Sequence, residues 1–281
     1  MRETSNPVFR SLPKQQGGYA TFGSGVAGAA AAAQVQQGYE PYIDQQQRGV
    51  SRPLTIDDVV TKTGITLAVL SVVGVISYFL VSANLALATP FALIGALGGL
   101  GLVLFATFGR KQDNPAIVLS YAALEGLFLG AISFIFANLM SSGGGAMILQ
   151  AVIGTLGVFF GMLVVYKTGA IRVTPKFTRM IVAGMIGVLV LMLANFLAAI
   201  FGLNGGAGLG LRDGGMLAIG FSLVCIALAA FSFLIDFDAA DQMIRAGAPE
   251  KAGWGIALGL TVTLVWLYIE ILRLLSYFQS D

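Results

Sequence analysis

The stretch MLAIGFSLVCIALAAFSFLID, residues 216–236, decides the fold class of this 281-residue chain. It contains twenty successive residues without a charge and ends on an acid, Asp236. A helix rises about 1.5 Å per residue, so about 20 apolar residues cross the roughly 30 Å hydrocarbon core of a bilayer. The stretch is therefore predicted to be a transmembrane helix.

Six further apolar runs of similar length lie elsewhere in the chain. The whole sequence is 57% hydrophobic and 11% charged, whereas soluble domains carry about 25% charged residues. We therefore predict an all-α fold, a polytopic membrane protein that forms a seven-transmembrane-helix bundle. The predicted spans are residues 64–83, 85–108, 115–140, 146–166, 177–201, 216–236 and 254–277.

The first 57 residues differ in composition from the rest of the chain. They are rich in Gln, Gly, Ala and Ser, and such a segment buries too little apolar surface to offset its ordering entropy. We predict a disordered cytosolic tail over residues 1–57 and a transmembrane domain over residues 58–281. Thr55 and Asp58 have the spacing of a capping box, which predicts a helix start just before the first span.

Several function classes are excluded by residue types that are rare or missing. The chain has no histidine, which excludes Ser-His and Cys-His catalysis and H-E-x-x-H zinc sites. Any proton sensing near neutral pH then falls to carboxylates. Cys225 is the single cysteine and forms no intrachain disulfide, and a net charge of +2 does not indicate a nucleic-acid partner.

The distribution of Lys and Arg predicts the orientation in the membrane. If the N-terminus lies inside, 14 of the 16 basic residues lie in the tail or in inner loops. Arg212 is then the one basic residue in an outer loop, and Arg273 lies within the last span. We therefore expect a cytoplasmic N-terminus.

Three pairs of glycines within the spans are four residues apart, a spacing that lets helices approach closely. We expect these faces to pack within the bundle, and a dimer interface is the alternative. The pairs are Gly95 with Gly99, Gly126 with Gly130, and Gly157 with Gly161.

Four ionisable residues lie within or at the edge of the spans: Glu125, Asp236, Glu270 and Arg273. Each costs roughly 2.5–3.5 kcal/mol at the centre of a membrane helix, so such residues usually mark function. Glu125 lies near the bilayer middle with no basic residue within reach on its own helix. It is either protonated or paired across helices, and function and packing are equally open for it.

The apolar residues Phe237, Ala240 and Ile244 allow the sixth helix to continue past Asp236, which would place Asp236 about 12 Å from its inner end. Helix rise places Glu270 about 19 Å from the inner end of its span. Side chains lean toward the helix N-terminus, so these two carboxylates, on oppositely directed helices, are expected to lean toward each other. Arg273 follows Glu270 at i+3 and is able to neutralise it. A structural ion pair and a proton-sensing role both stay open for Glu270.

Two motifs near the C-terminus resemble a known family. FSFLID (residues 231–236) and LYIEILRLL (residues 267–275) are similar to the C-terminal motif of the Bax inhibitor (YccA-like) family. The resemblance covers about residues 58–278. It implies seven spans and a cytosolic N-terminus, and it implies a pH-sensitive calcium leak channel.

The resemblance also implies roles for individual residues. In the family two aspartates on the last two helices share a proton and bias the closed state against the open one. Asp236 matches the first, and Glu270 matches the second with glutamate in place of aspartate. Arg110 matches a basic residue that latches one aspartate. Arg273 is an addition beside Glu270 that favours the ionised carboxylate and so modulates proton sharing.

The leading hypothesis is a pH-sensitive calcium leak channel, gated by Asp236 and Glu270, which are also weak candidate ligands for a permeant Ca²⁺. We expect no resident cofactor and no enzymatic activity. One alternative is a non-conducting scaffold that binds other membrane proteins. The other is an intramembrane aspartyl protease, which the missing G-x-G-D pattern disfavours. The expected partners are the lipid bilayer and a cation, and the expected location is a bacterial plasma (inner) membrane.

Overall fold

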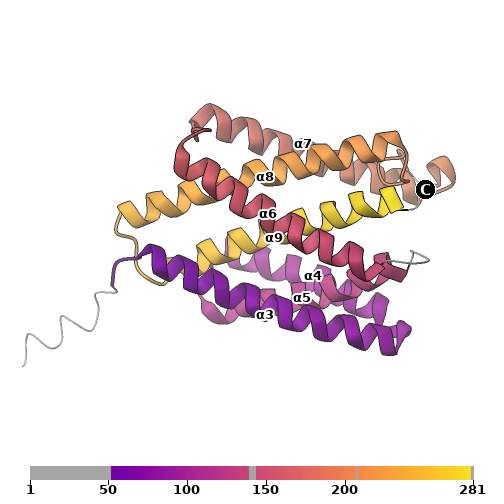
Figure 1. Cartoon of the computed structure of the whole chain (residues 1–281), viewed down its shortest axis with the longest axis horizontal. Coiled ribbons are helices and arrows are strands. Elements are labelled where there is room, and N and C mark those ends of the chain that lie inside the picture. Colours follow the sequence, from indigo (N-terminus) through magenta and orange to yellow (C-terminus); the bar gives the residue numbers. More distant parts are fainter. Residues whose placement is uncertain (1–51, 139–143, 207, 280–281) are drawn as a thin grey trace, which may run out of the picture. The chain divides into compact units, whose positions relative to one another are not determined.

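Seven long helices form the part of the chain that the computed structural model describes, which is residues 52–138, 144–206 and 208–279 (Figure 1). All seven are long and apolar enough to cross a membrane, which confirms the predicted all-α, seven-span fold class. The helices are α3 (Ile56–Ala83), α4 (Ala88–Phe108), α5 (Pro115–Asn138), α6 (Gly144–Thr168), α7 (Pro175–Ile200), α8 (Met216–Arg245) and α9 (Ala252–Gln279). Two short turns, η2 (Leu85–Leu87) and η3 (Leu203–Gly206), precede α4 and α8.

The start of α3 follows from its capping residues. Thr55 Oγ1 accepts from the backbone N–H of Asp58 at 3.3 Å, and Asp58 Oδ2 accepts from the N–H of Thr55 at 2.9 Å. This is the predicted capping box, and it satisfies two backbone donors that a helix start leaves without partners. Asp58 therefore belongs to the first turn of α3.

The ordered bundle begins before the predicted boundary at residue 58. Leu54 is buried, and its N–H donates to the carbonyl of Ala248 at 2.8 Å. The N–H of Glu250 donates to the carbonyl of Arg52 at 2.9 Å. The two backbone hydrogen bonds and the burial of Leu54 together hold residues 52–55 against the turn between α8 and α9. The rest of the predicted tail, residues 1–51, lies outside the described residues.

Different loops connect the helices at the two ends of the bundle. We call the end that holds loops 109–114, 169–174 and 246–251 the Arg110 end, and the end that holds loop 201–215 the Arg212 end. An ion pair of 2.7 Å between Lys251 and Asp113 joins two loops of the Arg110 end. Helix α8 runs nine residues beyond Asp236 toward this end, as its apolar pattern predicted.

Helix α9 lies at the centre of the bundle. Two thirds of its apolar window is buried, against 17% or less for α3, α4, α6 and α7. It contacts α3, α5, α6 and α8, and Figure 1 shows it between the helices drawn in indigo and those drawn in orange. Its charged side chains, Glu270 and Arg273, are therefore largely shielded by the neighbouring helices.

Two of the three predicted glycine pairs are packing surfaces. A Cβ on Gly95 would lie 2.6 Å from the carbonyl oxygen of Leu124, so α4 packs closely on α5. A Cβ on Gly126 would lie 2.7 Å from the carbonyl oxygen of Leu70, so α5 packs equally closely on α3. A Cβ added to Gly157 or to Gly161 on α6 would have no atom of a neighbouring helix within 4 Å. The prediction of packing within the bundle is wrong for this pair.

Candidate functional site

A polar cavity of about 380 Å³ opens at the Arg110 end. We call it the vestibule. The end of α4 and the loop after it, one face of α8 and the first half of α9 form its walls. Its lining residues are Thr107, Arg110, Gln112, Asp113, Asp236, Ala239, Met243, Ala252, Gly255, Ile256 and Gly259.

Asp236 is the deepest acid of the vestibule. It precedes the last residue of α8 by nine positions, which places it about 13 Å from that end of the helix. Thr263 Oγ1, on α9, donates to Asp236 Oδ2 at 2.8 Å. The side chain is partly buried and lines the cavity, about 13 Å along α8 from the Arg110 end of that helix.

Arg110, for which the resemblance implies a latch role, lines the same vestibule as Asp236. It takes a left-handed backbone conformation with φ 52°, which costs a residue other than glycine roughly 1 kcal/mol. Among the described residues no carboxylate lies within ion-pair distance of its guanidinium. Arg110 and Asp236 therefore line one cavity without forming an ion pair.

Asp113 is the second carboxylate of the vestibule. Its hydrogen bond with Lys251 holds the pKa of this carboxyl below its ordinary value, against a smaller opposing effect of burial. Asp113 thus stays ionised through the physiological range, and its charge is shared with Lys251. Asp236 is consequently the vestibule acid with no cation bound to it among the described residues.

Glu270 lies in a different place, within a cluster of two arginines near the Arg212 end. Arg212 donates from Nη1 to Oε2 and from Nη2 to Oε1, both at 3.0 Å. Arg273 Nη1 donates to Oε1 at 2.8 Å. The side chains are 3% exposed for Glu270, 17% for Arg212 and 19% for Arg273, so both pairs are shielded from solvent. We call these three residues the arginine–glutamate cluster.

The loop before α8 positions Arg212. Its neighbour Leu211 is buried with Phe221 and Cys225, and the Arg212 guanidinium lies 5.2 Å from the Phe221 ring centroid. Asn195 Oδ1 on α7 accepts from the N–H of Leu209 at 2.9 Å and fastens the loop. Desolvation lowers the pKa of this guanidinium, but the hydrogen bonds and the charge of Glu270 together raise the pKa above its ordinary value. Arg212 is therefore a permanent cation inside the bundle.

The two predicted sensor residues do not meet. Asp236 lies at the level of Thr263, and Glu270 follows Thr263 on α9 by seven residues, or about 10 Å. No hydrogen bond joins the two carboxylates, both of which are described. The two carboxylates, which we expected to lean toward each other, are not in contact here, and Arg212 and Arg273 hold both oxygens of Glu270. A shared proton stays a prediction for another conformation.

Glu125 belongs to neither group. It is 8% exposed on α5, and a Cβ on Gly99 of α4 would lie 2.6 Å from its Oε1. Its carboxyl group is thus packed against the glycine face of α4, where no basic side chain of the described residues pairs with it. Its role stays open.

No cluster of three or more acidic or cysteine side chains occurs in residues 52–138, 144–206 and 208–279. Ca²⁺ takes six to eight oxygen ligands, so a dedicated calcium site needs several carboxylates or carbonyls together. Asp236 and Asp113 line one cavity, while Glu270 is bonded to two cations. A permeant cation would therefore meet Asp236 and not Glu270 in this conformation.

Comparison with protein families identifies the chain. A family model described as Bax inhibitor 1 like matches residues 6–280. The chain belongs to the Bax inhibitor 1-like family. The match begins well before residue 58, so the family likeness extends into the N-terminal segment that we had placed outside it. A search of curated proteins finds no match to this Bax inhibitor 1-like protein.

Sequence reasoning missed Arg212 as a site residue of this Bax inhibitor 1-like protein. The contact with Glu270 joins positions 58 residues apart, which helix periodicity does not report. One feature of the sequence could have indicated the contact. Arg212 is the single basic residue of the predicted outer loops, and the predicted depth of Glu270 places this acid nearer to the outer side of the membrane.

Proposed function

We propose that this Bax inhibitor 1-like protein is a pH-sensitive leak channel for calcium or another cation. The observation that carries the proposal is the water-accessible vestibule that ends on Asp236. A carboxylate about 13 Å along α8 from the Arg110 end attracts a cation into the vestibule, since hard cations prefer oxygen ligands. Protonation removes that charge and weakens the attraction.

The arginine–glutamate cluster supplies the closed end of the proposed pathway. Between Asp236 and Glu270 the bundle is filled by fully buried side chains, including Leu234 and Leu267. Arg212 and Arg273 then place two positive charges beyond this plug, which oppose a cation. The conformation is therefore a closed one, open to water at the Arg110 end only.

We also propose that the Arg110 end faces the cytoplasm of a bacterial cell. Ten basic residues of the described part gather at this end, and loops rich in Lys and Arg stay on the cytoplasmic side. These ten are Arg52, Lys62, Arg110, Lys111, Lys167, Arg172, Lys176, Arg179, Arg245 and Lys251.

Calcium flux into proteoliposomes that contain only this protein tests the proposal. We expect flux to fall as the pH is lowered, because the protonated form of Asp236 binds a cation poorly. Asp236→Asn should give low flux with no pH dependence. Asp238→Asn is the matched control, because Asp238 lies outside the vestibule on the same helix and bonds Gln242. It should keep the wild-type profile.

Two results would contradict the proposal. Flux no greater than that of protein-free liposomes at every pH would favour the non-conducting scaffold. A pH profile of Asp236→Asn that matches the wild type would show that another group senses the proton.

A further inference from the structure

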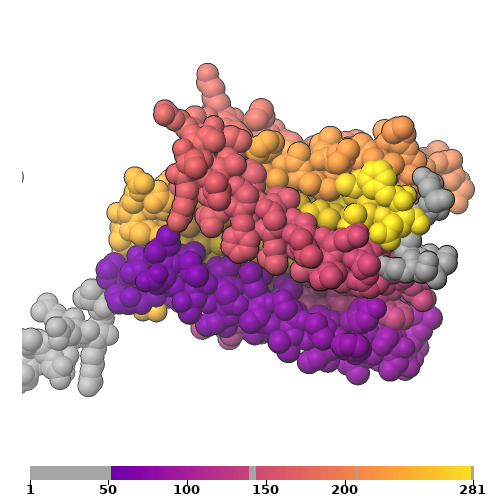
Figure 2. Space-filling model, viewed as in Figure 1, coloured from indigo at the N-terminus to yellow at the C-terminus, as the bar shows by residue number. Residues whose placement is uncertain are grey.

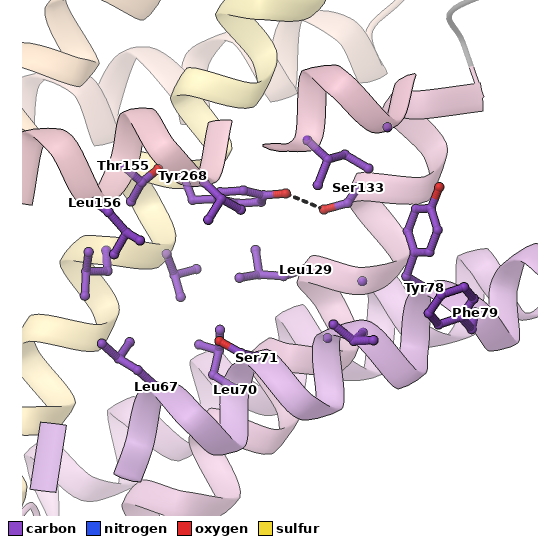
Figure 3. Close-up of a pocket in the computed structure, with 18 residues that line it drawn as sticks. Leu67, Leu70, Ser71, Tyr78, Phe79, Leu129, Ser133, Thr155, Leu156 and Tyr268 are labelled. Atoms are coloured by element: carbon purple, nitrogen blue, oxygen red, sulfur yellow. Dashed lines mark hydrogen bonds between the residues drawn. The ribbon is translucent and has the colours of Figure 1, made fainter. Parts of the chain in front are cut away.

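A second cavity, of about 610 Å³, opens sideways between α3 and α6. We call it the lateral groove. Helices α3 and α6 form its two walls, and α5 and α9 form its floor (Figure 3). It is distinct from the vestibule, because the two cavities share no lining residue. Figure 2 shows the face of the bundle on which α3, in indigo, and α6, in red, lie beside one another.

The groove opens on the side of the protein that faces lipid. Val75 and Phe79 on α3 and Val152 and Leu156 on α6 line it and are 40–64% exposed. In a helix that spans a membrane, exposed apolar side chains contact acyl chains. The mouth of the groove therefore opens into the surrounding bilayer.

The interior of the groove does not favour water. At its floor the hydroxyls of Ser133 and Tyr268 bond each other at 2.7 Å, as Figure 3 shows. The hydroxyl of Thr155 donates to the carbonyl of Ala151 at 2.8 Å. Each of these three hydroxyls already has a protein partner, whereas a buried water needs two to four polar partners. If the groove were empty, the side chains that line it would lose the van der Waals contacts that an occupant provides.

The size of the groove selects one kind of apolar occupant. Along α3 the lining runs from Leu67 to Phe79, which is about 18 Å, close to the 15 Å of one leaflet of the hydrocarbon core. A partner helix that crosses the membrane has an apolar stretch of about 30 Å and would need a groove of that length. The groove is too short for such a helix and long enough for one acyl chain of a single leaflet.

The position of the groove identifies the leaflet. Gly145, at the start of α6, and Tyr78 lie at its outer end, while Leu67 and Leu264 lie nearer to the bilayer middle. Tyrosine is enriched where membrane and water meet, so the Tyr78 end is the headgroup end. We propose that the lateral groove binds one acyl chain of a phospholipid from the leaflet at the Arg212 end.

The groove adjoins the helix that carries the arginine–glutamate cluster. Tyr268, on its floor, precedes Glu270 by two residues on α9. An acyl chain in the groove therefore packs against α9 within one turn of Glu270. This inference stands apart from the proposed channel function, because binding is measured without any flux.

The test uses the full chain in liposomes that contain a phospholipid with a photoreactive diazirine near the middle of one acyl chain. We expect labelling to concentrate on groove residues such as Leu129 and Tyr268. Native mass spectrometry of the purified protein should show one retained phospholipid. Uniform labelling of all exposed helix faces, with no labelling of the groove floor, would overturn the proposal.

Two matched pairs of variants separate filling of the groove from damage to the fold. Val152→Trp on α6 and Val75→Trp on α3 place a large ring in the groove, and each should abolish the retained lipid and the floor labelling. The adjacent residues Ile153 and Ile76 are 62% and 51% exposed and do not line the groove. Ile153→Trp and Ile76→Trp should keep both signals. Retention of the lipid by both filling variants would contradict the site.

Discussion

Glu270 is the most constrained charge in the described part of the protein. Its two carboxylate oxygens accept three hydrogen bonds from two arginines, while it is itself 3% exposed. Two cations around one anion leave a net positive charge in a place with little water. Such an arrangement holds together only while the carboxylate is ionised, since an unpaired buried charge is costly.

The two acids should therefore respond differently to neutral substitution. Glu270→Gln leaves Arg212 and Arg273 without their counter-charge, so we expect a loss of about 3–5 kcal/mol in the free energy of unfolding. Asp236→Asn keeps an oxygen that accepts from Thr263 Oγ1, so we expect a change of less than about 1 kcal/mol. Denaturation of both variants in detergent micelles measures the difference. Equal losses would contradict the assigned surroundings of the two residues.

The same contrast shows what the sequence predicts at the residue scale. Helix rise placed Asp236 and Glu270 at different depths, and the structure has them about 10 Å apart along α9 instead of the expected 7 Å. Their partners were not predictable in the same way. Thr263 and Arg273 lie on the same helix as Glu270, whereas Arg212 reaches it through a folded loop whose path no periodic pattern encodes.

At the scale of helices, glycine decides which faces come together. The lengths of the apolar runs predicted all seven helices, because a bilayer of fixed thickness demands a fixed number of residues. The runs do not specify which helix lies beside which. The spacing of glycines indicated three close-packed faces, but only the pairs on α4 and α5 have a neighbouring helix.

Alanine at two of these glycines should therefore have opposite effects. A Cβ on Gly130 would overlap the carbonyl oxygen of Gly74 and lie 2.5 Å from Ser77 Cβ, so α3 and α5 must separate. We expect Gly130→Ala to cost about 1–3 kcal/mol. Gly161→Ala is the matched control on α6, where nothing lies within 4 Å, and should gain about 0.5–1 kcal/mol. Midpoints of denaturation in mixed micelles report both changes, and a destabilised Gly161→Ala would reveal a partner for that face.

At the scale of the whole molecule, the two ends of the bundle differ in whether a polar cavity opens there. The Arg110 end has a polar cavity that leads to Asp236, and its loops carry most of the basic residues. The Arg212 end is closed by a loop that inserts one arginine into the bundle. A leak channel must also open at the Arg212 end. Opening there requires the contacts between Arg212 and Glu270 to break.

Cysteine accessibility tests this asymmetry from both sides of the membrane. The buried Cys225 is replaced by alanine, and Ala239→Cys places a thiol in the vestibule. A membrane-impermeant thiol reagent should modify it from the Arg110 side and not from the other side. Met216→Cys, 86% exposed at the start of α8, is the control and should react only from the Arg212 side. Adding Arg212→Gln should make Ala239→Cys reactive from both sides, because the loop no longer binds Glu270. Reaction of Ala239→Cys from the Arg212 side while Arg212 is intact would show that the arginine–glutamate cluster does not close the bundle.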